Sequence, residues 1–259
     1  MPRRGGIACA CGVLTLCAMR SAAAVPAFSA GTELPYEDGV FPTAVVAADF
    51  DGDGDLDVVA TYKDSNDVVW WENEDGRGAF SAGRQIAGDA RGAHAVWTAD
   101  VDGDGDEDVV VADEKDNRVT WYMNTGGGGF SAGEDLADDV RATHAVWVGD
   151  LDGDGDPDVL ASSPLKGQVT WWANGDDGAL AAGHQFGPSR HVADGGAKGC
   201  FAVLGADVDS DGLMDIVTVV QKDERVVWFQ NLGDGQFSPE PTEVSDGTIS
   251  KQINHCRQQ

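Results

Sequence analysis

The stretch that decides the fold reads Asp49-Phe-Asp51-Gly-Asp53-Gly-Asp55-Leu-Asp57, and it returns at residues 100–108, 150–158 and 207–215. All four copies fit the pattern D-x-D-x-D-G-x-x-D. Carboxylates this close together repel one another unless a cation lies among them. Clustered oxygen donors are the ligands that Ca²⁺ prefers, and the Gly at position 6 permits a sharp turn. The sequence therefore predicts four acidic loops that bind about four Ca²⁺ ions.

The predicted metal ligands occupy positions 1, 3, 5, 7 and 9 of each loop. They are Asp49, Asp51, Asp53, Asp55, Asp57, Asp100, Asp102, Asp104, Asp106, Asp108, Asp150, Asp152, Asp154, Asp156, Asp158, Asp207, Asp209, Asp211, Leu213 and Asp215. The plain alternative is a solvated Asp/Gly linker, which four copies in one register disfavour. An EF-hand is the nearest competitor, but it needs a Glu at position 12 and helices on both sides. Position 12 holds Ala60, Val111, Ala161 and Thr218, and the flanks are β-branched, so each loop is predicted to join two strands of a hairpin.

Each loop opens a longer repeat. An Asn stands 24 residues after the first Asp of every loop, at Asn73, Asn124, Asn174 and Asn231. An aromatic strand precedes each Asn, at residues 68–71, 119–122, 169–172 and 226–229. A Gly-rich turn and a fourth strand follow, and these strands are expected to begin at Phe80, Phe130, Leu180 and Phe237. In the second unit the first two strands are expected at 93–99 and 109–112. The repeats are spaced by 51, 50 and 57 residues, and the last spacing suggests an insertion around 188–199.

A period near 50 residues with four strands per unit is typical of a β-propeller. The expected fold is all-β, with about four four-stranded blades. Tandem aromatics such as Trp70-Trp71 are predicted to fill the spaces between blades rather than to form a sugar-stacking platform, because adjacent strand residues point to opposite faces. The architecture is either a closed four-bladed ring or an incomplete arc of a larger propeller.

The two ends favour the arc. Phe28–Gly31 copies the start of a fourth strand with no first three strands before it, while the fourth unit has its own last strand at 237–244. Circular closure would need one shared blade, and one strand is left over. The end blades of an arc expose apolar faces, which predicts self-association.

The acidic loops resemble those of the FG-GAP/VCBS repeat family, which also occurs in the integrin α-chain propeller. The resemblance extends from Phe28 to about Val244 and includes the segment Trp228-Phe-Gln-Asn-Leu-Gly-Asp-Gly-Gln-Phe237. It implies Ca²⁺ held in the hairpin between the first two strands of a blade. It also implies seven or eight blades, where this chain has four loops. The repeat region is expected at 28–245, followed by a tail at 246–259.

The N-terminal residues 1–24 are predicted to form a secretory signal peptide. Arg3 and Arg4 give the positive start, residues 7–19 are apolar, and Ala22–Ala24 offers a cleavage site. The apolar stretch is too short to cross a hydrocarbon core of ~30 Å, so the mature chain is expected to be secreted without a membrane span. Of the cysteines, Cys200 and Cys256 remain after cleavage, and a disulfide between them is left open. The net charge of −28 disfavours nucleic acids and anionic membranes as partners.

A second candidate site lies away from the acidic loops. The resemblance implies that ligands bind the opposite face of the propeller. The candidate ligand-binding residues there are Lys63, Arg91, His94, Lys115, Arg141, His144, Lys166 and Lys222. Together they would form a basic mouth for an anionic glycan or an acidic loop of an extracellular protein, and solvated turn lysines are the alternative. His94 and His144 could also act as general bases, but their repetition at equivalent places favours a structural role.

The leading hypothesis is a secreted Ca²⁺-binding propeller segment that acts as an adhesion or carbohydrate-binding or protein-binding module. One rival is an enzyme, such as a polysaccharide lyase or hydrolase, and another is a purely structural fragment. The sequence contains no H-E-x-x-H or P-loop motif, and no catalytic residue is predicted. A binding role is therefore favoured over catalysis.

Overall fold

The computed structural model describes residues 33–34, 36, 41–137, 140, 142–175, 186–193 and 199–244. The chain divides into two compact units, residues 1–33 and 34–259, and Glu33 is the one described residue of the first. The predicted signal peptide, the segment 28–31, Arg141, Leu180, Cys256 and the tail 246–259 lie outside the described residues. Within the described part, no helix has both the length and the apolar character needed to cross a membrane.

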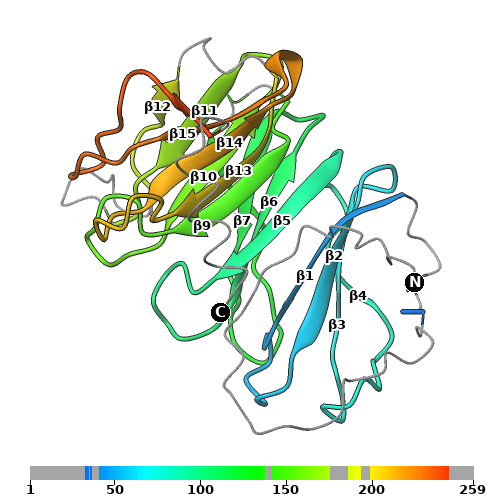
Figure 1. Cartoon of the computed structure of the whole chain (residues 1–259). Helices are drawn as coiled ribbons and strands as arrows, with labels where there is room; N and C mark the ends of the chain where they lie inside the picture. Colours follow the sequence, from blue (N-terminus) through cyan, green and yellow to red (C-terminus); the bar gives the residue numbers. More distant parts are fainter. Residues whose placement is uncertain are drawn as a thin grey trace, which may run out of the picture. The chain divides into compact units, whose positions relative to one another are not determined.

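Four antiparallel sheets of four strands each make up the described part of the second unit (Figure 1). The first contains β1 (Pro42–Ala48), β2 (Asp57–Tyr62), β3 (Asp67–Trp71) and β4 (Arg84–Ala87). The second contains β5 (Ala93–Ala99), β6 (Asp108–Asp113), β7 (Arg118–Tyr122) and β8 (Glu134–Ala137). The third contains β9 (Ala145–Gly149), β10 (Asp158–Ser163), β11 (Gln168–Trp172) and β12 (Arg190–Ala193). The fourth contains β13 (Cys200–Ala206), β14 (Asp215–Val220), β15 (Arg225–Phe229) and β16 (Thr242–Glu243), with a 3₁₀ turn η1 (Gln221–Asp223) before β15.

Every sheet is built in chain order, so each strand pairs with the strand that precedes it in the sequence. The acidic loop joins the first and second strands as a hairpin connection, which confirms the prediction. The β-branched residues that follow each loop form the second strand, where branched side chains pack well on a pleated surface. In the second sheet the first strand covers Ala93–Ala99, as the sequence predicts.

The core lies between consecutive sheets. We call the side of a sheet that points toward the next sheet in the sequence its forward face, and the other side its backward face. Trp70 lies on the forward face of the first sheet and packs with Val109 and Tyr122 of the second. Trp71, the next residue, lies on the backward face and packs with Leu34 and Tyr36. Both indole rings are buried, so this pair packs in the core as predicted and is not available as a sugar platform, whereas Trp228 of the fourth pair is half-buried.

The sheets follow one another as an open row. β1 lies beside β5, β5 beside β9, and β9 beside β13, while no substantial strand contact in the described residues joins the first sheet to the fourth. The all-β propeller arc is therefore confirmed, and the closed four-bladed ring is not formed. Cys200 is a buried free thiol whose Sγ lies 3.1 Å from the carbonyl oxygen of Gln168, and nothing in the described residues pairs it with another cysteine.

The third unit corrects one prediction. Phe186, and not Leu180, forms the β-bridge with Asn174 that Phe130 forms with Asn124. The ring of Phe186 packs 6.0 Å from that of Trp121, as Phe130 packs 6.5 Å from Trp70. An aromatic ring is needed to fill this space between sheets, so the chain aligns on Phe186. Most of the additional residues of this unit therefore precede Phe186, rather than lying at 188–199.

The fourth strands also begin later than expected. The residues Phe80, Phe130 and Phe237 each form an isolated bridge to the repeat's Asn, and the strands themselves begin at Arg84, Glu134 and Thr242.

Candidate metal centres

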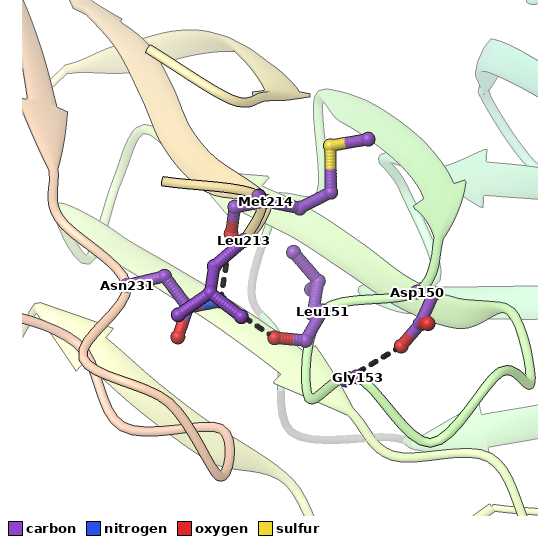
Figure 2. A pocket seen from close by; sticks show the side chains of 7 residues that line it. Asp150, Leu151, Gly153, Leu213, Met214 and Asn231 are labelled. Atoms are coloured by element: carbon purple, nitrogen blue, oxygen red, sulfur yellow. Dashed lines mark hydrogen bonds between the residues drawn. The ribbon is translucent and has the colours of Figure 1, made fainter. Parts of the chain in front are cut away.

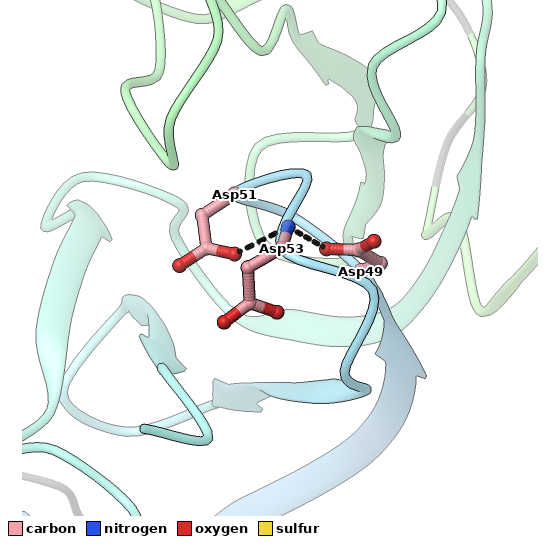
Figure 3. Close-up of side chains that lie close together, drawn as sticks. All are labelled: Asp49, Asp51 and Asp53. Atoms are coloured by element: carbon pink, nitrogen blue, oxygen red, sulfur yellow. Dashed lines mark hydrogen bonds between the residues drawn. The ribbon is translucent and has the colours of Figure 1, made fainter. Parts of the chain in front are cut away.

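Three carboxylates converge in the first acidic loop (Figure 3). Oxygen atoms of Asp49, Asp51 and Asp53 all lie within 4.8 Å of one another. The backbone N–H of Asp53 donates to Asp49 Oδ1 at 3.1 Å and to Asp51 Oδ1 at 3.2 Å, and Figure 3 shows both hydrogen bonds. The loop thus folds back on itself and directs several anionic oxygens toward one point.

The same convergence occurs in all four loops. The clusters are Asp49, Asp51 and Asp53; Asp100, Asp102 and Asp104; Asp150, Asp152 and Asp158; and Asp207, Asp209 and Asp215. Positions 1 and 3 belong to every cluster, while the third member comes from position 5 in the first two loops and from position 9 in the last two.

The same backbone turn occurs in each of the four acidic loops. The position-6 glycines Gly54, Gly105, Gly155 and Gly212 have φ between +93° and +99°, a conformation that residues with a Cβ rarely adopt. Each of them donates its N–H to Oδ2 of the position-1 Asp, at 2.9 to 3.1 Å. The Gly that the sequence pattern requires therefore holds the first carboxylate in place.

The position-9 Asp anchors the loop to the sheet. Asp108 is fully buried; its Oδ1 accepts the N–H of Asn124 at 2.7 Å, and its Oδ2 accepts the N–H of Val101 at 3.1 Å. Asp57, Asp158 and Asp215 make the same pair of hydrogen bonds. These carboxylates were predicted as metal ligands; the structure shows that they also tie the acidic loop to the end of the third strand.

The position-7 side chains lie outside the clusters. Asp55 lies against Gly76, Asp106 against Gly126, and Asp156 against Gly175. Position 7 is Leu213 in the fourth loop, which offers only a backbone carbonyl. The backbone carbonyl at position 7 is common to all four loops, so it is the group at this position that could serve as a metal ligand in each of them.

Burial and mutual repulsion both act on the clustered carboxyls. Burial, with the neighbouring carboxylates, raises the pKa of Asp51, Asp102 and Asp152 above the ordinary value of 3.8. Burial also raises the pKa of Asp108 to about 6 and that of Asp158 to about 7. A divalent cation among these oxygens would favour their charged forms and offset the repulsion.

Two buried carboxylate oxygens without a hydrogen-bond partner indicate that the loops can accommodate a metal ion. Asp100 Oδ1 and Asp152 Oδ1 are buried and accept no hydrogen bond. Buried carboxylate oxygens are rarely left without a partner, since their desolvation is costly. The donors are all hard oxygens, so the loops fit Ca²⁺ or Mg²⁺ rather than a softer metal. In the third cluster Arg190 Nη1 lies 4.0 Å from Asp152 Oδ2 and contributes some positive charge of its own.

The repeated Asn links consecutive sheets, a role that the sequence did not reveal. Asn231 Nδ2 donates to the carbonyl oxygen of Leu151 in the preceding acidic loop at 2.7 Å, and to that of Met214 in its own sheet at 2.9 Å. Figure 2 shows Asn231 between these two residues, beside a small pocket that Asp150 and Leu213 also line. Asn124 and Asn174 bridge to Phe50 and Val101 in the same way. In the sequence, the signal for this role was the unvarying 24-residue spacing between the first Asp of each loop and the Asn.

The residues of the predicted basic mouth are largely paired with acidic groups. Lys63 forms a salt bridge with Glu114, Lys115 Nζ lies 3.7 Å from Asp64, and Arg91 Nη1 lies 3.3 Å from Asp116. Lys166 is half-buried, Lys222 is exposed in η1, and Arg141 lies outside the described residues. These pairings reduce the positive charge that an anionic ligand would meet. The ligand site remains a prediction.

The two histidines form part of a ladder across the first strands. Their ring centroids lie 3.7 Å apart, with the ring planes tilted by 41°. His94 Nδ1 lies 3.0 Å from the carbonyl oxygen of His144, and His144 Nδ1 lies 3.0 Å from that of Phe201. A carbonyl accepts, so both Nδ1 atoms carry a proton. Burial lowers the pKa of each ring, and this neutral, hydrogen-bonded state fits the structural role.

The second repeat contains a serine motif at residues 129–133. Gly129-Phe-Ser131-Ala-Gly133 matches the letters of the G-x-S-x-G nucleophile elbow, but no helix follows it as that elbow requires. Ser131 Oγ accepts the N–H of Met123 at 3.2 Å and donates to the carbonyl oxygen of Ala132 at 3.1 Å. Ser81 makes the same pair of contacts in the first sheet. The motif is therefore a structural element of the repeat.

Comparison with known proteins agrees with this geometry. Four segments match the FG-GAP-like repeat, at residues 49–111, 100–161, 150–218 and 207–254. None of the curated proteins compared with the chain matched it.

Several solved structures share the fold. A lectin from Agrocybe aegerita that recognises non-reducing terminal N-acetylglucosamine is 23% identical, with a TM-score of 0.54, and the match covers 78% of this chain and 51% of the lectin. BBS1N, solved in complex with ARL6DN, is 12% identical, with a TM-score of 0.52 and coverages of 81% and 59%. A protein assigned as a 6-phosphogluconolactonase from Bacteroides uniformis is 15% identical, with a TM-score of 0.50 and coverages of 78% and 53%. The chain thus spans between half and three-fifths of the length of these proteins.

Proposed function

Because the chain belongs to the FG-GAP-like repeat family, we propose that it is an exported, Ca²⁺-binding β-propeller segment that binds a glycan or an extracellular protein. The observation that carries the metal-binding part is the convergence of carboxylates at the same place in four sheets, with buried oxygens of Asp100 and Asp152 that lack a partner. Ca²⁺ tolerates irregular sets of 6–8 oxygen ligands, whereas Mg²⁺ demands a near-ideal octahedron. The third member of the cluster comes from different positions in different loops, and such irregular sets of oxygens favour Ca²⁺.

Export is proposed because the predicted leader and the predicted metal require the same compartment. Extracellular Ca²⁺ modules bind with dissociation constants of roughly 10⁻⁴–10⁻³ M, which only an environment rich in Ca²⁺ saturates. Expression of the full chain in a secreting host, followed by mass spectrometry of the mature N-terminus, tests this part. A product that keeps residues 1–24 contradicts export.

Titration calorimetry of chelator-treated protein tests the metal sites. We expect Ca²⁺ to bind at several sites per chain, with Mg²⁺ much weaker. Asp100→Asn replaces a carboxylate that has an orphaned oxygen, and should remove one site. Asp64→Asn is the matched control, because Asp64 lies outside the clusters and is 56% exposed. Equal loss of Ca²⁺ binding in both variants would argue against the assignment.

The binding role is supported by the fold more than by any single residue. One structural neighbour is a lectin, so this architecture can carry glycan recognition. Loops remote from the acidic clusters, which carry Lys115 and Lys222, are the proposed ligand surface. We expect a Lys115→Ser/Lys222→Ser variant to lose binding on a glycan array in Ca²⁺. Arg77→Ser, in a turn near the acidic loops, should keep it. Identical arrays from both variants would exclude this surface.

A further inference from the structure

The forward face of the fourth sheet carries one charged residue, Asp215, whose carboxylate is fully buried and accepts two backbone N–H groups at the loop end of β14. Paired strands place nine residues on it: Ala202, Leu204, Ala206, Asp215, Val217, Val219, Val226, Trp228 and Thr242. Because Asp215 is buried, the exposed part of the face is apolar and edged by one threonine, on a chain whose net charge is −28. Apolar sheet faces of this kind normally lie against another layer of structure.

The equivalent positions of the other sheets are covered. Val226 is 39% exposed, whereas Val68, Val119 and Val169, which occupy its place in the first three sheets, are 0% exposed. Val219 is 38% exposed, whereas Thr61, Ala112 and Ser162 at its place are also 0% exposed. Leu204 is 47% exposed on the same face. In the first three sheets the following sheet provides the cover, and in the described residues nothing follows the fourth.

The edge of this face also differs in charge. A charged residue pairs with the forward-facing Trp in the first three sheets: Trp70 with Arg84, Trp121 with Glu134, and Trp171 with Arg190. In the fourth sheet Trp228 pairs with Thr242. On its forward face the fourth sheet therefore lacks the edge charge that the other three sheets carry, and the charged residue of β16, Glu243, lies on the backward face.

The two ends of the row are not alike. At the first sheet, Leu34 and Tyr36 pack over the backward face, and Trp71 beneath them is 1% exposed. The ring of Tyr36 lies 5.3 Å from that of Tyr62 and 6.3 Å from that of Trp71. One end is thus capped by the chain itself, and the other is open in the described residues.

We propose that the forward face of the fourth sheet docks a second copy of this chain, through the same face, in a two-fold dimer. A two-fold contact uses one self-complementary surface, so it leaves the capped first sheet undisturbed. Two apolar sheet faces can pack as aligned layers about 10 Å apart. A head-to-tail contact would instead require displacement of Leu34 and Tyr36. This dimer does not depend on the proposed ligand-binding role.

The acidic charge gives the dimer a characteristic salt dependence. Two chains of charge −28 repel each other, and salt screens that repulsion over distances of about 8–10 Å at 0.1–0.15 M. The apolar contact itself is not weakened by NaCl. Association should therefore tighten between 50 and 500 mM NaCl, the opposite of an interface held by ion pairs.

Sedimentation velocity of the full chain in saturating Ca²⁺ tests the proposal. We expect a concentration-dependent dimer. Val226→Asp should weaken it by at least about 100-fold, because the charge enters the interface twice in a two-fold dimer. Leu165→Asp is the matched control: it makes the same kind of change at an apolar residue that is 79% exposed and lies in the turn before β11. It should leave the dimer intact. Circular dichroism should show both variants folded, since both sites are exposed.

A mixing experiment identifies the partner surface. Val226→Asp and Val226→Lys should each be monomeric alone, and an equimolar mixture should recover a dimer, because opposite charges then meet across the contact. In a head-to-tail contact each charge would face the first sheet, and mixing would recover nothing. A wild-type chain that stays monomeric at all concentrations and salts overturns the proposal, as does a Val226→Asp dimer of wild-type affinity.

Discussion

Replacing Asn124 by Ala should cost measurably more stability than replacing Asn73 by Ala. The two residues occupy the same place in consecutive repeats, and both are buried, at 0% and 8% exposure. Asn124 Nδ2 donates to Glu107 O at 3.1 Å and to Phe50 O of the preceding loop at 2.8 Å, and its Oδ1 accepts the N–H of Gly126. Asn73 Nδ2 donates to Leu56 O, and its Oδ1 accepts the N–H of Gly78. No sheet precedes it in the described residues.

The difference between the two variants isolates one hydrogen bond between sheets. A net contribution of about 0.5–1.5 kcal/mol per bond gives a loss of roughly 2 kcal/mol for Asn73→Ala and roughly 3 kcal/mol for Asn124→Ala. Phe50 O also accepts the N–H of Gly128 at 3.1 Å, so the carbonyl is not left without a partner in the variant. The difference should therefore stay near 1 kcal/mol, or about 2–4 °C in Tm for a domain of this size.

Urea unfolding in saturating Ca²⁺, followed by tryptophan fluorescence, measures both free energies of unfolding. The slope with urea should not change, because the same surface is exposed on unfolding. Asn231→Ala, which breaks the bond to Leu151, should resemble Asn124→Ala. If Asn73→Ala proves as costly as Asn124→Ala, the Asn contributes only within its own sheet, and the account of sheet-to-sheet linkage fails.

The acidic loops and the two histidines should each affect stability in a measurable way. Excess EDTA should lower Tm by many degrees relative to millimolar Ca²⁺, because four sites at ten times their Kd contribute about 1.4 kcal/mol each. Differential scanning calorimetry measures this shift, and an unchanged Tm would contradict metal binding. Asp108→Asn should destabilise the chain by about 1–3 kcal/mol even in EDTA, since both oxygens of the Asp108 carboxylate accept backbone N–H groups. Asp51→Asn should reduce only the stability that Ca²⁺ adds. Equal losses of stability in EDTA for the two variants would contradict the division into an anchoring Asp and a metal-binding Asp. Burial lowers the pKa of His94 and His144, so their protonation favours the unfolded chain as pH falls from 7.5 to 5.5, whereas Asp108 and Asp158, with pKa values raised to about 6 and about 7, favour the folded chain over the same range. The histidine contribution is therefore read as a difference: the free energy of unfolding of the wild-type chain should fall relative to that of a His94→Asn/His144→Asn variant as the pH is lowered, and equal pH slopes in both proteins would exclude the histidines.

The repeat alone was sufficient to predict the propeller blades. The period, the acidic hairpin and the paired aromatics each act within one unit, and short-range patterns of this kind are legible in a sequence. The third unit shows where the pattern misleads. Leu180-Ala-Ala-Gly matches the letters of the other units, but the space beside Trp121 needs an aromatic ring, and Phe186 fills it. Packing against the neighbouring sheet, not local similarity, sets that alignment.

The candidate metal loops were predicted as residue types and spacings, and the structure divided their roles. Asp49 and Asp51 converge on one point, Asp55 lies against Gly76, and Asp57 accepts two backbone N–H groups. A carboxylate at an alternate position in a turn can point toward the ion, toward the sheet or toward solvent. The path of the backbone decides among these directions, and the pattern D-x-D does not specify that path.

The sequence by itself determined the all-β class, the four blades and the acidic hairpins, because strand alternation, turn glycines and charge repulsion act over a few residues. Only the tertiary structure decided that the Asn residues bridge consecutive sheets, that one end of the row is capped by Leu34 and Tyr36, and that the opposite face at Val226 is open. These features depend on which sheet lies beside which. Identical repeats therefore carry the same sequence signal whether their faces are covered or exposed.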